Sequence, residues 1–284
     1  MDGAGDDRIY LSKAHGAEEG IERMDWQIIA LPFSSEPGHD MWRGPSAILK
    51  ALDLKPAVWV PVPIDEPTIE GWQALAKEFR QVVTPQLKAD RPWLFVTGEC
   101  TAAPLPVGAL QHVYGPVQVV WIDAHGDIHT PESSTSHFLG GMPLNLLIGG
   151  SLGEVRQAAG TDPIPLDHVT MVGTRDLDPA EAGLIRQSGI VPLYDPEAIR
   201  TRVAAIGLPA YLHVDIDVLD PTVNPAASYP SPGGMTLEAL VGILEQLATT
   251  GLIKAATVAA FSPGLDRDNL GLVAATRVMH QLLG

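Results

Sequence analysis

The sequence contains a single cysteine, Cys100, so no disulfide can form within its 284 residues. Low cysteine use is typical of a reducing compartment, and we expect a cytoplasmic protein. The sequence also lacks any run of eighteen apolar residues, and its N-terminal stretch MDGAGDDRIYLSKAHG is acidic where a secretory signal would be basic and then apolar. These features predict neither a membrane span nor a membrane partner.

Basic residues are scarce as well. Eighteen lysines and arginines face 34 aspartates and glutamates, which gives a net charge of −16. Nucleic acids and anionic membranes bind to surfaces rich in lysine and arginine, and this composition argues against both partners. We therefore expect a small-molecule substrate.

Apolar residues make up 45% of the chain, enough for a sizeable core. Residues 1–24 lack apolar periodicity and are expected to form a loosely ordered arm, whereas 25–284 form one domain. Within that domain, short apolar runs alternate with segments of helical periodicity, which predicts an α/β fold with a mostly parallel sheet covered on both faces. The predicted strands are 27–33, 58–62, 92–98, 117–124, 168–176, 190–195, 211–218 and 253–262. The predicted helices include 44–52, 72–87, 180–189, 196–206, 237–251 and 269–284.

Two groups of acidic residues follow predicted strands. WIDAHGD (121–127) leads from apolar residues into Asp123, His125 and Asp127, and HVDIDVLDP (213–221) contains Asp215 and Asp217. Residues two apart on an extended strand point to the same side, and strand ends of a parallel sheet meet at one edge. A D-x-D alone is often only a cap or turn, but both groups together would repel each other unless a cation lay between them. An oxygen-rich set with one imidazole suits a divalent ion such as Mn²⁺.

At these residues the sequence resembles the ureohydrolase family, which includes arginase, agmatinase and formiminoglutamase. DAHGD (123–127) matches the family motif D-A-H-x-D, and HVDIDVLDP matches S-x-D-x-D-x-x-D-P. Further similar segments are GPSAILKAL (44–52), VGTRDLDPAE (172–181) and SPGGMTLEAL (231–240). The resemblance implies a three-layer α/β/α fold, a binuclear manganese site and a homo-oligomer, either a trimer or a hexamer.

The family pattern also implies roles for the individual ligands. Asp123 and Asp215 would bridge two ions, His125 and Asp217 would complete one of them, and Asp127 would bind the other. The family's first ligand is a histidine, and Cys100 stands at that position. Because a thiolate adds negative charge to four carboxylates, either Cys100 stays protonated, one ion is lost, or a more thiophilic ion such as Zn²⁺ binds. A buried Cys100 without a ligand role remains an alternative.

Two further positions depart from the family. Gly140 stands where a histidine usually transfers protons, and Ala260 stands where a glutamate meets the substrate's guanidinium group. His129 and His137 lie in the same loop and are candidate proton carriers, although loop histidines are often merely exposed. Ser136 matches a family serine that helps to bind substrate.

The sequence therefore predicts a metal-dependent hydrolase of a non-peptide C–N bond, in an amidine, guanidine, urea-like or amide molecule. The ions would lower the pKa of a bound water, the resulting hydroxide would attack the carbon, and Asp127 would accept the water's proton. The absence of the family glutamate at position 260 disfavours a standard arginase or agmatinase. The alternative is a protein of the same fold that has lost catalysis and acts as a binding or scaffold subunit.

Overall fold

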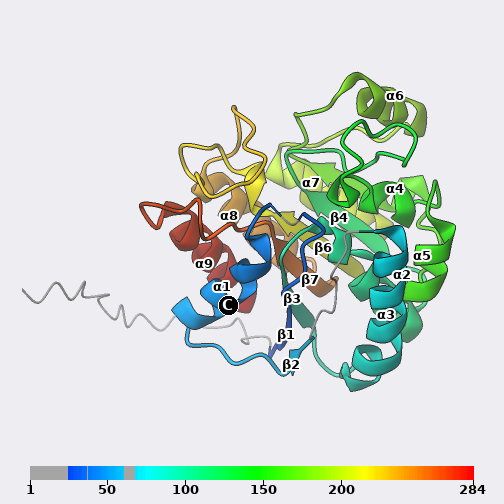
Figure 1. Cartoon of the computed structure of the whole chain (residues 1–284), viewed down its shortest axis with the longest axis horizontal. Helices are drawn as coiled ribbons and strands as arrows, with labels where there is room; N and C mark the ends of the chain where they lie inside the picture. The colour runs from blue at the N-terminus through cyan, green and yellow to red at the C-terminus, as the bar shows by residue number, and fades with distance from the viewer. Residues whose placement is uncertain (1–24, 37, 61–67) are drawn as a thin grey trace, which may run out of the picture.

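A computed structural model describes residues 25–36, 38–60 and 68–284. The arm expected at 1–24 lies outside these residues. Their central feature is a seven-stranded sheet with the order β2-β1-β3-β7-β6-β4-β5, in which every neighbouring pair is parallel (Figure 1). The strands are β1 (Gln27–Leu31), β2 (Val58–Trp59), β3 (Trp93–Thr97), β4 (Gln118–Ile122), β5 (Val169–Val172), β6 (Ala210–Asp215) and β7 (Ile253–Ala259). The predicted parallel sheet is confirmed.

Helices cover both faces of the sheet. One face packs against α1 (Gly44–Ala51), α7 (Pro196–Ile206), α8 (Leu237–Ala248) and α9 (Leu270–Leu283). The other face packs against α2 (Ile69–Glu78), α3 (Pro104–Tyr114), α4 (Pro143–Leu147), α5 (Gly153–Ala159) and α6 (Pro179–Ser188). Each face has its own apolar core, because alternate residues of the buried strands point to opposite sides. The three-layer α/β/α architecture is confirmed.

Local sequence explains where several helices begin. Asp178 precedes Pro179, and its carboxylate accepts hydrogen bonds from the backbone N–H groups of Ala180 and Glu181 at the start of α6. Asp195 and Pro196 begin α7 in the same way. A polar N-cap residue followed by proline satisfies free amides and presets the first helical turn. These two helices fall close to their predicted ranges.

Several predicted elements differ in extent. The helix expected over 72–87 is α helix only to Glu78 and continues as a π turn over Phe79–Val83 and a 3₁₀ turn over Thr84–Gln86. The strand expected over 190–195 makes a single bridge, between Leu193 and Val172. Val191 is 71% exposed and Pro192 has no amide to donate, so this segment does not extend the sheet. The part of the expected 58–62 strand at 61–62 lies outside the described residues.

In the described part of the chain, no helix is both long enough and apolar enough to cross a membrane.

Candidate metal centre

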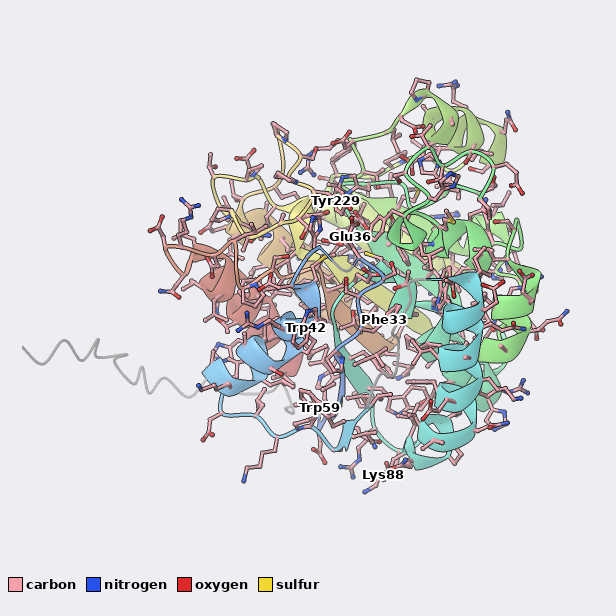
Figure 2. The ribbon with its side chains drawn as sticks, viewed as in Figure 1. Phe33, Glu36, Trp42, Trp59, Lys88 and Tyr229 are labelled. Atoms are coloured by element: carbon pink, nitrogen blue, oxygen red, sulfur yellow. The ribbon has the colours of Figure 1, made fainter. Side chains whose placement is uncertain are left out.

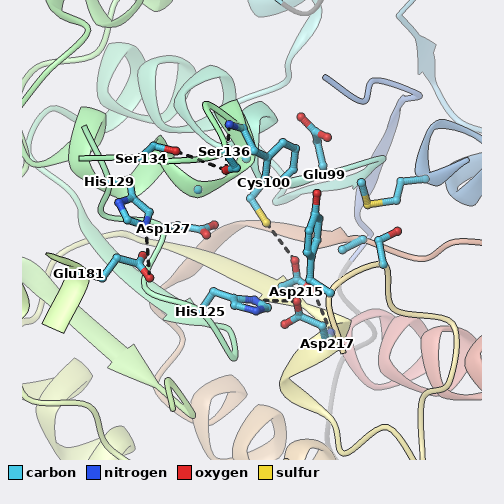
Figure 3. A pocket seen from close by; sticks show the side chains of 17 residues that line it. Glu99, Cys100, His125, Asp127, His129, Ser134, Ser136, Glu181, Asp215 and Asp217 are labelled. Atoms are coloured by element: carbon cyan, nitrogen blue, oxygen red, sulfur yellow. Dashed lines mark hydrogen bonds and ion pairs between the residues drawn. The ribbon is translucent and has the colours of Figure 1, made fainter. Parts of the chain in front are cut away.

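Four adjacent strands end at one pocket. Cys100 follows β3, Asp123 follows β4, Asp215 is the last residue of β6, and Ala260 follows β7. In the sheet these strands lie in the order β3-β7-β6-β4, so their carboxyl ends form a continuous edge. The pocket holds about 180 Å³ and is drawn in Figure 3. Such an edge is where open parallel sheets bind their ligands.

The first motif bends as soon as its strand ends. β4 stops at Ile122, and Asp123 Oδ1 then accepts a hydrogen bond of 2.7 Å from the backbone N–H of His125. Asp127 takes a left-handed backbone conformation with φ of 48°. The expectation that these residues continue an extended strand is therefore wrong for this motif. The bend nevertheless directs His125 and Asp127 into the same pocket (Figure 3), and Asp123 lies beside His125.

The second motif also turns. β6 ends at Asp215, residues Ile216–Val218 form a 3₁₀ turn, and Asp215 Oδ1 accepts from the N–H of Asp217 at 2.8 Å. Asp217 Oδ1 accepts in turn from the N–H of Ala124 at 3.2 Å. The extended geometry expected for this pair is wrong as well, because the carboxylates themselves satisfy the amides of the turn. The last of these bonds connects the two motifs.

The candidate ligand atoms form two clusters that share Asp123, and within each cluster they lie within 4.8 Å of one another. The first cluster contains Cys100, Asp123, His213 and Asp215. The second cluster contains Asp123, His125 and Asp217. In the first, Cys100 Sγ lies 3.0 Å from Asp215 Oδ2 and 3.9 Å from Asp123 Oδ2. In the second, His125 Nδ1 lies 3.0 Å from Asp217 Oδ2 (Figure 3). The same nitrogen lies 3.6 Å from Asp123 Oδ1.

The electrostatics of the clusters favour a cation. Burial, followed by the charge of Asp217, raises the pKa of Asp123 to about 6. Burial is also the main cause of the raised pKa values of Asp127 and Asp215 and of the Cys100 thiol. Burial opposes the charge on His125, but Asp217 and Asp123 raise its pKa to about 12. Without a metal the site therefore retains protons that a divalent ion would displace, and this donor set fits such an ion.

Asp127 and His213 stand apart from the predicted ligand pattern. Asp127 lines the pocket, yet it belongs to neither of these two clusters, nor to the third group found among the described residues, which contains His129, Asp178 and Glu181. His213 belongs to the first cluster. It is the first residue of the HVDIDVLDP motif, but the motif predicted no ligand role for it. The missed signal is strand alternation, which places residue 213 on the same face as 215. Asp127 Oδ2 and His213 Nε2 are both buried, and neither has a hydrogen-bond partner within residues 25–36, 38–60 and 68–284.

The two candidate loop histidines lie in different places. His129 lines the pocket, with Nδ1 3.0 Å from Ser133 Oγ and Nε2 3.3 Å from Asp178 and 3.6 Å from Glu181. His137 is exposed and lines a neighbouring hollow instead of this pocket. Ser136 is exposed and lines both hollows. The structure thus brings His129 and Ser136, but not His137, to the pocket that contains the clusters.

Position 140 has no room for a side chain. A Cβ atom on Gly140 would lie 2.2 Å from Cζ of the Phe138 ring. The ring of Phe138 therefore occupies the space that a histidine at 140 would need.

The wall opposite the acidic residues is largely apolar. Met41, Ala259 and Ala260 form a small buried cluster against which Phe138 packs. The Phe138 and Tyr229 rings are 5.2 Å apart between centroids, and the Tyr229 hydroxyl donates a hydrogen bond to Glu36 (Figure 2). Ala260 thus adds a methyl group to this wall, where a glutamate would have added a charge.

Arg175 supports the loop that carries Asp217. Its guanidinium donates to the backbone carbonyls of Asp217 at 3.2 Å, Val218 at 3.0 Å and Ser231 at 2.7 Å. A planar group with five N–H donors can make these bonds at once, and an ammonium group cannot reproduce that arrangement.

We expect Arg175→Lys to lower the free energy of unfolding by about 1.5–3 kcal/mol, the range for a charge-assisted hydrogen bond. Urea unfolding of the metal-free protein measures this loss. Arg202→Lys is the matched control, because Arg202 donates to a single carbonyl, that of Asp167, at an exposed position. Equal unfolding midpoints for the two variants would contradict the supporting role.

Comparisons with known proteins place this architecture among relatives. The sequence matches the Arginase family over residues 15–284. An arginase from Schizosaccharomyces pombe is 28% identical over 266 residues, which cover 89% of this chain and 77% of that protein. The N(omega)-hydroxy-L-arginine amidinohydrolase of Streptomyces lavendulae is 34% identical over 178 residues, covering 61% of this chain and 62% of that protein. The solved arginase from Bacillus caldovelox has a TM-score of 0.81 and 26% identity, covering 92% of this chain and 98% of that one.

Proposed function

Because the chain belongs to the arginase family, whose members are hydrolases of C–N bonds other than peptide bonds, we propose that its pocket hydrolyses such a bond in a small molecule. Divalent ions, when bound, would polarise the substrate and lower the pKa of a coordinated water. The observation that carries this proposal is the convergence of buried aspartates and an imidazole, within 4.8 Å of one another, at adjacent strand ends.

The two clusters and the family resemblance together suggest which residues would hold the ions. Asp123 belongs to both clusters and would contribute to both ions, and His125 and Asp217 would complete the ion of the second cluster. Cys100 and Asp215 would hold the ion of the first cluster. By the family resemblance, Asp215 would also reach the second ion and Asp127, from the same pocket, would be a further ligand. The ion is Mn²⁺ in one or two copies, with Zn²⁺ as the alternative that a sulfur donor favours.

The chain's own side chains would manage protons and orientation. Oδ2 of Asp127, which has no hydrogen-bond partner in the described part of the chain, would accept the proton of the attacking water. His129 lies in the pocket beside Asp178 and Glu181 and is better placed than His137 to carry that proton away. Ser136 lies at the pocket mouth, where its hydroxyl can bind the non-reacting end of the substrate.

The apolar wall selects the substrate. Ala260 supplies no carboxylate for a guanidinium, and Met41, Phe138 and Tyr229 offer apolar surface beside it. A guanidinium placed against Ala260 would have no carboxylate partner at that position, and burying a charge without a partner is unfavourable. We therefore propose a neutral or modified amidine, guanidine, urea-like or amide substrate in place of free arginine.

A substrate screen tests the proposal. Purified protein is loaded separately with Mn²⁺ and Zn²⁺ and incubated with amidines, guanidines, ureas and amides, and released ammonia, urea or amine is measured. Hydrolysis that depends on the added ion supports the proposal. A protein that binds both ions and releases none of these products from any class would instead indicate the scaffold alternative.

Cys100→His tests the ligand role of the sulfur. If Sγ holds the first ion, an imidazole removes one unit of excess negative charge and should raise Mn²⁺ occupancy toward two ions per chain. If Cys100 is only packed in the core, the larger ring overpacks the site and costs about 1–3 kcal/mol. Bound manganese and the melting temperature are measured for both proteins under identical loading. An unchanged metal count with a lowered melting temperature would leave the packing role alone.

The cytoplasmic location and the trimeric or hexameric state remain part of the proposal. Light scattering of the metal-loaded protein measures the number of chains in the oligomer.

A further inference from the structure

His213 belongs to the first cluster and lies on β6, two residues before Asp215. Alternation along β6 places Tyr211, His213 and Asp215 on one face of the sheet, and the neighbouring strand β4 places Trp121 in register with His213. The imidazole is fully buried and stacks on the Trp121 indole, with centroids 3.9 Å apart and an interplanar angle of 13°. The stack holds the ring in one plane, so its nitrogens have fixed directions.

A chain of hydrogen bonds sets the tautomer of this ring. The Tyr211 hydroxyl donates its proton to Thr257 Oγ1 at 2.8 Å. Its oxygen also lies 3.1 Å from His213 Nδ1, and the hydroxyl has no second proton, so Nδ1–H must be the donor in that contact. In the neutral ring Nε2 then carries a lone pair. Metal-bound histidines are oriented in this way, with the other ring nitrogen held by a hydrogen bond.

In the described part of the chain, no hydrogen-bond donor contacts the lone pair on Nε2. Nε2 is buried there without a hydrogen-bond partner. Leaving a buried acceptor unsatisfied is unfavourable, so packing in a central strand alone does not account for an imidazole at this position. The other donors of the first cluster, from Cys100, Asp123 and Asp215, are all negatively charged when they bind an ion, so a neutral donor would relieve their repulsion.

We infer that His213 Nε2 is a metal ligand, which completes a donor set of one sulfur, one imidazole and two carboxylates with Cys100, Asp123 and Asp215. This inference rests on the proposed metal centre and assigns a ligand that lies on a strand, outside the D-A-H-x-D loop. Four aspartates already balance two divalent ions and a Cys100 thiolate would exceed that balance, so a neutral imidazole supplies a further donor without adding charge. The mixed donor set of the first cluster favours Zn²⁺ over Mn²⁺, whereas the second cluster contains only oxygen and nitrogen donors.

Metal titration of His213→Asn tests the inference. Asparagine keeps a polar atom near the position of Nδ1, for contact with Tyr211, and removes Nε2. We expect the affinity for one of two Zn²⁺ ions to fall by about 10-fold or more, with the other ion retained. His112→Asn is the matched control, because His112 is exposed on α3. Tyr211→Phe, which removes only the orienting hydroxyl, is expected to weaken the same ion to a smaller extent.

A measurement on the wild-type chain covers the case in which a variant fails to fold. In protein labelled with ¹⁵N-histidine and loaded with ¹¹³Cd²⁺, two imidazoles are expected to show ¹¹³Cd–¹⁵N coupling, and His213→Asn should lose one coupling while His125→Asn loses the other. Coupling to His125 alone, together with unchanged affinities in His213→Asn, would overturn the role of His213 and leave the proposed function intact. A wild-type chain that binds neither ion would overturn both.

Discussion

Asp123→Asn is expected to reduce bound metal to near zero ions per chain. Asp123 is the residue that the two clusters share, so its carboxylate is placed to neutralise both ions at once. An amide carries no charge, and Asp215 and Asp217 cannot take its place without breaking the hydrogen bonds that they accept from the backbone N–H groups of Asp217 and Ala124. Elemental analysis after dialysis against Mn²⁺ or Zn²⁺ measures the loss.

The same substitution should make the metal-free variant more stable than the metal-free wild type, whereas in the presence of metal the wild type should be the more stable protein. The substitution removes a buried carboxyl group that lies among other acidic residues. The amide oxygen of asparagine can still accept the hydrogen bond from the N–H of His125. Without metal, the variant should therefore unfold at a higher temperature than the wild type. With metal, only the wild type gains stability. The gain in the free energy of unfolding is about 2.7 kcal/mol when the free ion concentration is one hundred times the dissociation constant. Asp167→Ala, at an exposed position, serves as the control. Full metal content in Asp123→Asn would count decisively against the proposed site.

The second large effect concerns arginine, which the wild-type protein is expected to hydrolyse poorly if at all. Ala260 offers a methyl group where a carboxylate would pair with the guanidinium, and a charge-assisted hydrogen bond contributes about 1.5–3 kcal/mol. Restoring that charge with Ala260→Glu should therefore raise kcat/KM for arginine by roughly 10- to 150-fold. Ala260 already has a left-handed backbone conformation with φ of 68°. The backbone strain of this conformation is therefore present in the wild type and is not introduced by the glutamate.

Ala260→Gln separates charge from size in this experiment. Glutamine has nearly the shape of glutamate but no charge, and it should leave arginine turnover near the wild-type rate. Urea release is measured for the three proteins at equal metal content. Efficient urea release by the wild type, or equal gains from glutamate and glutamine, would show that the pocket recognises guanidinium by another route.

Sequence patterns predicted the sheet because its buried strands are short apolar runs with helices between them. They also located Asp123, His125, Asp215 and Asp217 at one edge, since parallel strands end together. They did not predict the bends within both motifs, because these depend on hydrogen bonds that the carboxylates of Asp123 and Asp215 accept from backbone amides two residues ahead. Nor did they find His213, which periodicity presents as one more buried strand residue and which only the stack on Trp121 and the contact with Tyr211 distinguish.

The order of strands in the sheet also determines when the site can form during folding. Cys100 and Asp215 are 115 positions apart in sequence, and the strand between theirs in space, β7, is the last strand in the chain. Closing such long loops is entropically costly, so the contacts that bring these ligands together form late. An ion that binds only the completed site stabilises the native state but not an earlier transition state. Bound metal would therefore prolong the lifetime of the folded protein by slowing unfolding, while the rate of folding stays the same.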